Sequence, residues 1–175
     1  MESILSLDHI YYSYHDKNGE TPVINDLSFE IKPGSFTSIV GPSGCGKSTL
    51  LSLLCDLIKP EAGTIYIRPP ENNTDSRMGY MLQKDNLFEW RSIYKNVMLG
   101  LEINNKKTPE NIAYVNHLLE QYDLAEFKSA RPSQLSGGMR QRAALIRTLA
   151  LKPDILLLDL SLIHISEPTR LDVIS

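Results

Sequence analysis

The stretch FTSIVGPSGCGKSTLLSLL, residues 36–54, decides the fold. The apolar run FTSIV (36–40) is typical of a buried strand, and KSTLLSLLCDLI (47–58) predicts a buried helix of about twelve residues. Between them, GPSGCGKST (41–49) fits the pattern G-x-x-x-x-G-K-[ST]. Its glycines turn the backbone so that successive N–H groups point inward, where they and the positive end of the helix bind phosphate oxygens. The stretch therefore predicts a phosphate-binding loop between a strand and a helix.

Within this loop the residue types assign different tasks. We expect Lys47 to reach the β- and γ-phosphates and the Ser48 hydroxyl to bind Mg²⁺, which prefers hard oxygen ligands. Cys45 fills a free position of the pattern and is interpreted as tolerated there, while Cys55 is most simply a buried apolar residue. The residues predicted to contact the phosphates are Gly41, Pro42, Ser43, Gly44, Cys45, Gly46, Lys47, Ser48 and Thr49.

The bulk properties fit one soluble domain. The chain has 175 residues, of which 42% are hydrophobic and 22% charged, and these values are typical of a packed globule. A net charge of −3 gives no indication of nucleic-acid binding, and two cysteines favour a reducing cytoplasm. We find neither a signal-peptide pattern at the N-terminus nor the run of about 18 apolar residues that a membrane span needs.

Strands and helices alternate along the chain, which favours an α/β core. Apolar and β-branched runs predict strands at 4–14, 21–31, 33–40, 64–68, 77–83 and 153–159. Helical patterns cover 92–103, 109–124 and 136–151, and Pro109 suits a first helical turn. We interpret residues 84–134 as a helical insert.

A second glycine-bearing motif, LSGGMRQR (135–142), opens a long helix and predicts a second anion site. One domain rarely needs two such sites for one nucleotide. A head-to-tail dimer, in which Ser136, Gly137 and Gly138 face the γ-phosphate held by the other subunit, accounts for both sites. The alternative is that Ser136 is a helix N-cap followed by flexible glycines.

With GPSGCGKST, LSGGMRQR and ILLLD in this order, residues Leu5 to Asp159 resemble the ATP-binding cassette family, the nucleotide-binding subunits of ABC transporters. The resemblance implies a P-loop nucleoside triphosphate hydrolase fold with N-terminal antiparallel strands, with ATP and Mg²⁺ as cofactors. It implies that Tyr14 stacks on adenine, that Gln83 contacts Mg²⁺ and the attacking water, and that Asp159 holds Mg²⁺. The alternative for Tyr14 is an ordinary tyrosine at the edge of a strand, and the alternative for Gln83 is a polar residue that ends a strand.

Within the family, the segment 81–103 is similar to importers of nitrate, sulfonate, taurine and pyrimidine-type substrates, although Glu89 stands where a proline usually precedes Trp90. The groove beside this segment is where the family docks a membrane subunit, and the alternative for Trp90 is core packing. The implied partners are transmembrane permease subunits, a solute-binding protein indirectly, and a second copy of the domain, at the cytoplasmic face of the cell membrane. Rival functions are a DNA-repair or translation-factor ATPase and an ATP-binding regulator.

The sequence departs from the family pattern after Asp159. The family places a glutamate there as general base, and a switch histidine about thirty residues later; this chain has Leu160, which cannot act as a base. We expect residues 1–159 to form a partial nucleotide-binding domain and interpret 160–175 as a foreign tail, similar to translated sequencing-adapter sequence. The alternatives are a family segment displaced by a seven-residue insert and a natural ATPase that has lost its base.

Overall fold

The computed structural model describes residues 3–17, 19–68 and 78–159. The tail 160–175, which we interpret as foreign, lies outside the described residues. None of the described helices combines the length and hydropathy that crossing a membrane requires.

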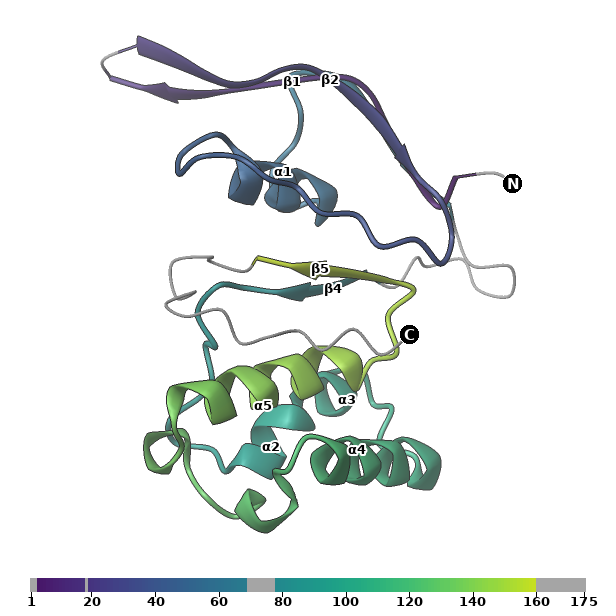
Figure 1. Cartoon of the computed structure of the whole chain (residues 1–175), viewed down its shortest axis with the longest axis vertical. Helices are drawn as coiled ribbons and strands as arrows, with labels where there is room; N and C mark the ends of the chain where they lie inside the picture. The colour runs from purple at the N-terminus through teal and green to yellow at the C-terminus, as the bar shows by residue number, and fades with distance from the viewer. Residues whose placement is uncertain (1–2, 18, 69–77, 160–175) are drawn as a thin grey trace, which may run out of the picture.

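The N-terminal region forms an antiparallel sheet of three strands in the order β2-β1-β3 (Figure 1). Strand β1 (Leu5–Asp16) pairs with β2 (Gly19–Ile31) on one side and with β3 (Ala62–Ile67) on the other. Both pairings are irregular between β1 residues 7 and 11. At this point Gly63 lies so close to β1 that no side chain would fit. A Cβ atom at Gly63, whose φ is +89°, would lie 2.2 Å from the His9 carbonyl oxygen. These strands were predicted correctly.

A second sheet supplies the α/β core. Strands β4 (Met78–Met81) and β5 (Ile155–Leu158) pair in parallel, with Met78 opposite Ile155. Helix α1 (Lys47–Leu54) lies on one face of this pair and α5 (Gly137–Leu149) on the other (Figure 1). A parallel pair covered by helices on both faces explains why β5 is apolar throughout.

The predicted strand at 33–40 is wrong. Within the described chain, residues 35–42 form neither helix nor strand. The side chain of Phe36 is 92% exposed and that of Val40 is 81% exposed. An apolar segment becomes a strand only when a neighbouring strand satisfies its backbone groups, and no described strand pairs with this segment.

Helix α1 ends at Leu54, four residues earlier than predicted. Asp56 has a φ of +58°, which breaks the helical conformation. The N–H of Asp56 donates to the Leu53 carbonyl and that of Leu57 to the Ser52 carbonyl. This pair of hydrogen bonds is the Schellman ending, which the sequence here forms without the usual glycine.

The segment between β4 and α5 is helical, in shorter pieces than predicted. It contains α2 (Ile93–Val97), α3 (Leu99–Ile103), α4 (Pro109–Gln121) and the 3₁₀ turns η1 (Ala125–Phe127) and η2 (Pro132–Gln134). The predicted helix at 92–103 is thus split at Met98, while α4 begins with Pro109 as expected.

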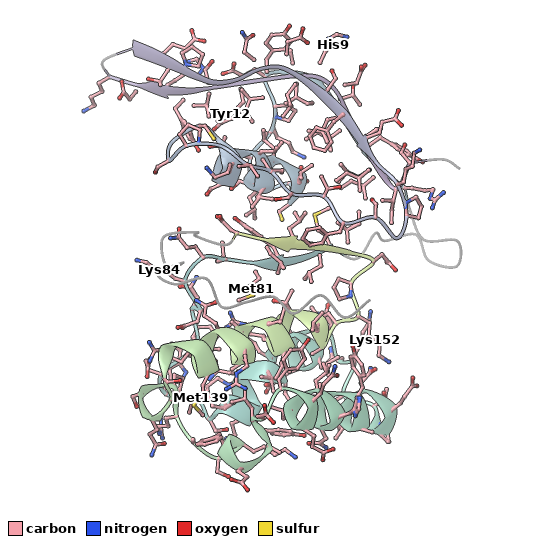
Figure 2. The ribbon with its side chains drawn as sticks, viewed as in Figure 1. His9, Tyr12, Met81, Lys84, Met139 and Lys152 are labelled. Atoms are coloured by element: carbon pink, nitrogen blue, oxygen red, sulfur yellow. The ribbon has the colours of Figure 1, made fainter. Side chains whose placement is uncertain are left out.

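Two hydrophobic clusters lie on opposite sides of the β4–β5 pair. One cluster joins residues of β1 and β2 and the leucines of α1 to Leu157, with Tyr12 packed against it. The other joins α2, α3, α4 and α5 to Met81, which lies between the sheet and α5 (Figure 2). The carboxyl ends of β4 and β5, where Gln83 and Asp159 follow, are therefore supported from both faces.

Candidate functional site

The loop 41–46 leads into a helix whose first turn has no side-chain cap. The N-cap of α1 is Gly46, with a φ of +95°, and no side chain accepts a hydrogen bond from its first turn. The other two described helices of eight residues or more are capped, α4 by Thr108 and α5 by Ser136. A helix start with free N–H groups and a positive dipole end binds an anion.

The Lys47 ammonium group lies over the same loop. Its Nζ donates to the carbonyl oxygens of Gly41 and Pro42, both at 2.8 Å, and lies 3.5 Å from the Sγ of Cys45. Phosphate oxygens bound at this loop would compete with these two carbonyl oxygens for the hydrogen bonds of the ammonium group. The thiol of Cys45, in the same loop, is exposed.

Tyr14, predicted to stack on adenine, lies next to this helix. Its hydroxyl is 3.2 Å from the Oγ1 of the buried Thr49 in α1, and its ring packs edge-to-face against Tyr12 with centroids 5.2 Å apart. The side chain is 49% exposed, which leaves ring surface open for stacking. The fold thus brings a residue of β1 to the first turn of α1, 35 positions away in sequence.

Gln83 and Asp159 follow the carboxyl ends of neighbouring strands. The Asp159 N–H donates to the Met81 carbonyl at 2.9 Å, which extends the β4–β5 pairing by one residue. Gln83 is exposed and Asp159 half-buried. Burial, reinforced by the Asp159 carboxylate, raises the pKa of the Tyr80 phenol.

The LSGGMRQR motif lies at the start of α5, on the opposite face of the β4–β5 pair from α1 (Figure 1), with Ser136, Gly137 and Gly138 exposed and Leu135 buried. The Oγ of Ser136 accepts a hydrogen bond from the Met139 N–H at 3.3 Å, so Ser136 is an N-cap in this chain. A Cβ at Gly137 or Gly138 would meet no atom within 4 Å. Neither glycine is required by local packing, and both residues are exposed.

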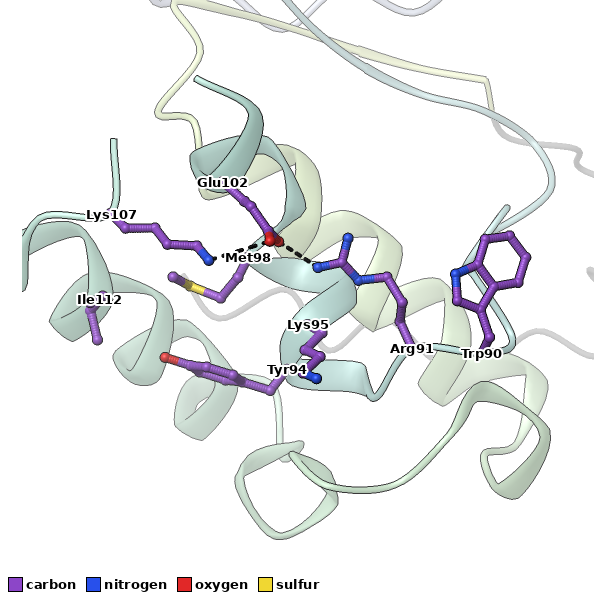
Figure 3. Close-up of a pocket in the computed structure, with 8 residues that line it drawn as sticks. All are labelled: Trp90, Arg91, Tyr94, Lys95, Met98, Glu102, Lys107 and Ile112. Atoms are coloured by element: carbon purple, nitrogen blue, oxygen red, sulfur yellow. Dashed lines mark hydrogen bonds and ion pairs between the residues drawn. The ribbon is translucent and has the colours of Figure 1, made fainter. Parts of the chain in front are cut away.

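A groove lies beside the segment that follows Gln83 (Figure 3). It has a volume of about 730 Å³. Glu102 forms ion pairs with Arg91 and with Lys107, the latter at 3.6 Å (Figure 3). Trp90 is 70% exposed and rests on Phe88 with ring centroids 4.8 Å apart, so it is not a core residue. The groove is lined by Trp90, Arg91, Tyr94, Lys95, Met98, Glu102, Lys107 and Ile112.

The charged members of this groove were missed from sequence because they come from three separate segments. Arg91 precedes α2, Glu102 lies in α3 and Lys107 precedes α4. The signal present in the sequence was the tryptophan segment itself, in which Arg91 follows Trp90. Spacing alone does not indicate that a break at Met98 brings Glu102 back to Arg91.

A phosphate-binding loop between a backbone turn and a helix, beside a parallel α/β core, defines the class of P-loop nucleoside triphosphate-binding proteins. Comparison with known proteins narrows this class. Residues 24–161 match the model of the family described as ABC transporter. The chain belongs to the ABC transporter family, as its ATP-binding domain.

Individual relatives agree with this assignment. The chain is 46% identical over 158 residues to an uncharacterized ABC transporter ATP-binding protein, YtlC, of Bacillus subtilis; the match covers 90% of this chain and 61% of the relative. It is 39% identical over 142 residues to a taurine import ATP-binding protein, TauB, of Jannaschia sp., covering 81% of this chain and 53% of the relative. The chain thus spans little more than half the length of these relatives.

A solved structure shows the same fold. The dimeric post-hydrolysis state of the ATP-binding cassette MJ0796, bound to ADP and Pi, superposes with a TM-score of 0.75 at 31% identity. The match covers 88% of this chain and 72% of that chain. The predicted fold class, a P-loop fold with antiparallel N-terminal strands and helical elements, is confirmed.

Proposed function

We propose that the chain is part of the ATP-binding and ATP-hydrolysing subunit of an ABC importer of small solutes. The observation that carries this proposal is the uncapped start of α1, with Lys47 folded over the loop 41–46. On binding the triphosphate, the Lys47 ammonium exchanges its two carbonyl partners for phosphate oxygens. The loop N–H groups and the helix dipole supply further positive potential.

The oxygen donors of Ser48, Gln83 and Asp159 are of the kind that binds Mg²⁺. Ser48 is exposed in the first turn of α1, and Asp159 directly follows β5, so the chain offers a hydroxyl and a carboxylate as ligands. The Gln83 amide oxygen is a third donor of the hard type that Mg²⁺ prefers. The ion would neutralise charge on the β- and γ-phosphates, while Ser48, Gln83 and Asp159 hold it in position.

The second glycine motif supports a head-to-tail pair of domains. Ser136, Gly137 and Gly138 are exposed and separated from the chain's own phosphate loop by the β4–β5 layer (Figure 1). Their N–H groups therefore serve a nucleotide held by another copy. The related cassette MJ0796 is described as dimeric with ADP and Pi bound, which agrees with this arrangement.

The groove of Figure 3 is the proposed docking surface for a permease subunit at the cytoplasmic face of the membrane. Its exposed Trp90 offers an apolar anchor, and the cations Arg91, Lys95 and Lys107 outnumber the single Glu102. The transported solute does not contact this domain. The TauB relative and the tryptophan segment favour a taurine-, sulfonate- or nitrate-like solute, delivered by a solute-binding protein.

Nucleotide binding tests the proposal through Lys47. We expect Lys47→Ala to weaken nucleotide binding by about tenfold or more, because hydrogen bonds to charged groups contribute about 1.5–3 kcal/mol each. Lys59→Ala is the matched control, since Lys59 is 75% exposed and pairs with Asp56 beyond the end of α1. Isothermal titration calorimetry with the non-hydrolysable analogue AMP-PNP measures both. Equal affinities for the two variants would contradict the proposal.

Hydrolysis by this chain is proposed to be slow because Leu160 occupies the position of the general base. A positioned base contributes about 10²–10⁴-fold to a rate. We therefore expect turnover at least about a hundredfold below that of an intact ABC ATPase measured beside it. A phosphate-release rate within about tenfold of the intact enzyme would show that Leu160 is no impairment.

A further inference from the structure

Side chains of α5 bind the turn that follows β4, at residues 83–86. Arg147 donates from one guanidinium nitrogen to the Asn86 carbonyl at 2.8 Å and from the other to the Asp85 carbonyl at 2.7 Å. Arg140, seven positions earlier on the same helix, donates from Nε to the Asp85 carboxylate at 3.1 Å. Residues seven apart lie on one helix face, so both arginines reach the same turn.

Gln141 adds a third contact at the first residue of the turn. Its Nε2 donates to the carbonyl of Gln83 at 3.1 Å. The turn itself contains a left-handed residue, Asn86, with a φ of +45°, and the Asp85 carboxylate accepts the Leu87 N–H at 3.2 Å. The turn is held mainly by side chains of a helix that lies more than fifty positions away in sequence.

Arg147 is suited to this contact by its shape. Its planar fork presents two donors to two successive carbonyls, which a lysine ammonium cannot match. The side chain is half-buried, and burial lowers its pKa while the Asp85 carboxylate opposes that shift. Because an arginine titrates far above neutral pH, the group stays charged, and its hydrogen bonds are of the stronger, charge-assisted kind.

The N-cap of the same helix is Ser136, four residues before Arg140. One end of this linkage is therefore Gln83, proposed above to contact the nucleotide's Mg²⁺ and water. The other is Ser136, proposed to contact the nucleotide of a partner copy. We propose that Arg147, supported by Arg140 and Gln141, is a positioning residue that makes the 83–86 turn and the start of α5 move as one body. This inference rests on the proposed function for its consequence, but its structural part is independent of nucleotide.

Hydrogen exchange of the full chain without nucleotide tests the structural part. We expect Arg147→Ala to speed backbone amide exchange in the peptide covering 82–87 by about tenfold, because local opening no longer breaks these hydrogen bonds. Arg147→Lys gives an intermediate rate. The matched control is Arg142→Ala on the same helix, whose guanidinium donates to the Tyr122 carbonyl at 2.7 Å and pairs with Asp123. It should leave the 82–87 peptide unchanged.

Addition of Mg-AMP-PNP tests the coupling. In the unmodified chain we expect the nucleotide to slow exchange in the loop 41–49, in the 82–87 peptide and in the first turn of α5. In Arg147→Ala the protection of 41–49 remains and that of α5 is lost. Asp85→Asn keeps both carbonyl acceptors of Arg147 but weakens the Arg140 contact, so it should lose part of the protection of α5.

Three outcomes separate the possible failures. Faster exchange throughout Arg147→Ala, including β1 and α1, would mean general destabilisation and overturn the proposal. Protection of α5 that is equal in Arg147→Ala and the unmodified chain, or absent from both while 41–49 is protected, would also overturn it. No protection of 41–49 in any variant would instead refute the proposed nucleotide binding. The nucleotide-free comparison would still decide whether Arg147 holds the 83–86 turn.

Discussion

At the residue scale, the two cysteines differ although both lie near α1. Cys45 is exposed on the phosphate loop, whereas Cys55 is half-buried and its Sγ lies 3.8 Å from the Met78 sulfur. Burial raises the pKa of Cys55 to about 11 from a model-peptide value of 9.0. The interpretation of Cys55 as a packed apolar residue agrees with this environment.

We predict that maleimide labels Cys45 first. Because burial raises the pKa of Cys55 from 9.0 to about 11, Cys55 carries about a hundredfold less thiolate at neutral pH than an unshifted thiol, and the thiolate is the nucleophile. Labelling of Cys55 rises with pH up to about 11, which mass spectrometry of single-cysteine variants Cys45→Ser and Cys55→Ser measures. Similar rates for both variants at pH 7 would contradict the assigned burial.

At the scale of the element, the short helix α2 is joined to the segment before it by Asn96. This side chain is 0% exposed. Its Oδ1 accepts the Phe88 N–H at 2.8 Å, and its Nδ2 donates to the carbonyls of Phe88, Arg91 and Ser92 at 3.1–3.2 Å. One buried amide thereby fixes the loop that presents Trp90 to the groove.

We predict that Asn96→Ala lowers the free energy of unfolding by about 1–3 kcal/mol, because it removes a fully buried amide together with its hydrogen bonds to the backbone of Phe88, Arg91 and Ser92. The matched control is Asn104→Ala, an exposed asparagine in the same region that donates one hydrogen bond, to the Gly100 carbonyl. Its effect should stay within about 0.5 kcal/mol. Urea unfolding followed by circular dichroism measures both, and equal effects would disprove the assigned role of Asn96.

At the scale of the whole molecule, the apolar segment 36–40 lies outside both hydrophobic clusters. Its exposed side chains are Phe36, Ile39 and Val40, with 92%, 41% and 81% of their surface accessible. Exposed apolar side chains gathered in one short segment are typical of surfaces that associate. The segment has the sequence pattern of a buried strand, but the other described residues leave these three apolar side chains exposed.

We predict that this segment drives self-association of the chain. The double substitution Phe36→Ser with Val40→Thr should raise the protein concentration at which light scattering detects oligomers. The control is Leu57→Ser, which changes an isolated apolar residue that is 65% exposed. If the double variant and the control scatter alike, association arises from another surface.

Much of the fold follows from local patterns. Strands β1, β2 and β3, the proline start of α4 and the serine cap of α5 were predicted because propensity and capping act within a few residues. Helix α1 was predicted too long, since its end depends on a left-handed Asp56 that no glycine announces. The split at Met98 was missed for the same kind of reason, because one apolar run fits one helix as well as two.

The sequence by itself determined the phosphate loop, the glycine motif of α5 and hence the family, because these depend on residue types at fixed short spacings. It also identified Gln83 and Asp159 as strand-end candidates, whose roles stay predictions. Tertiary structure alone decided that Tyr14 reaches Thr49, that Arg147 holds the turn at Asp85, and that residues 36–40 form no strand. Pairing and contact join segments distant in sequence, and such contacts depend on the packing of the whole chain rather than on any local pattern.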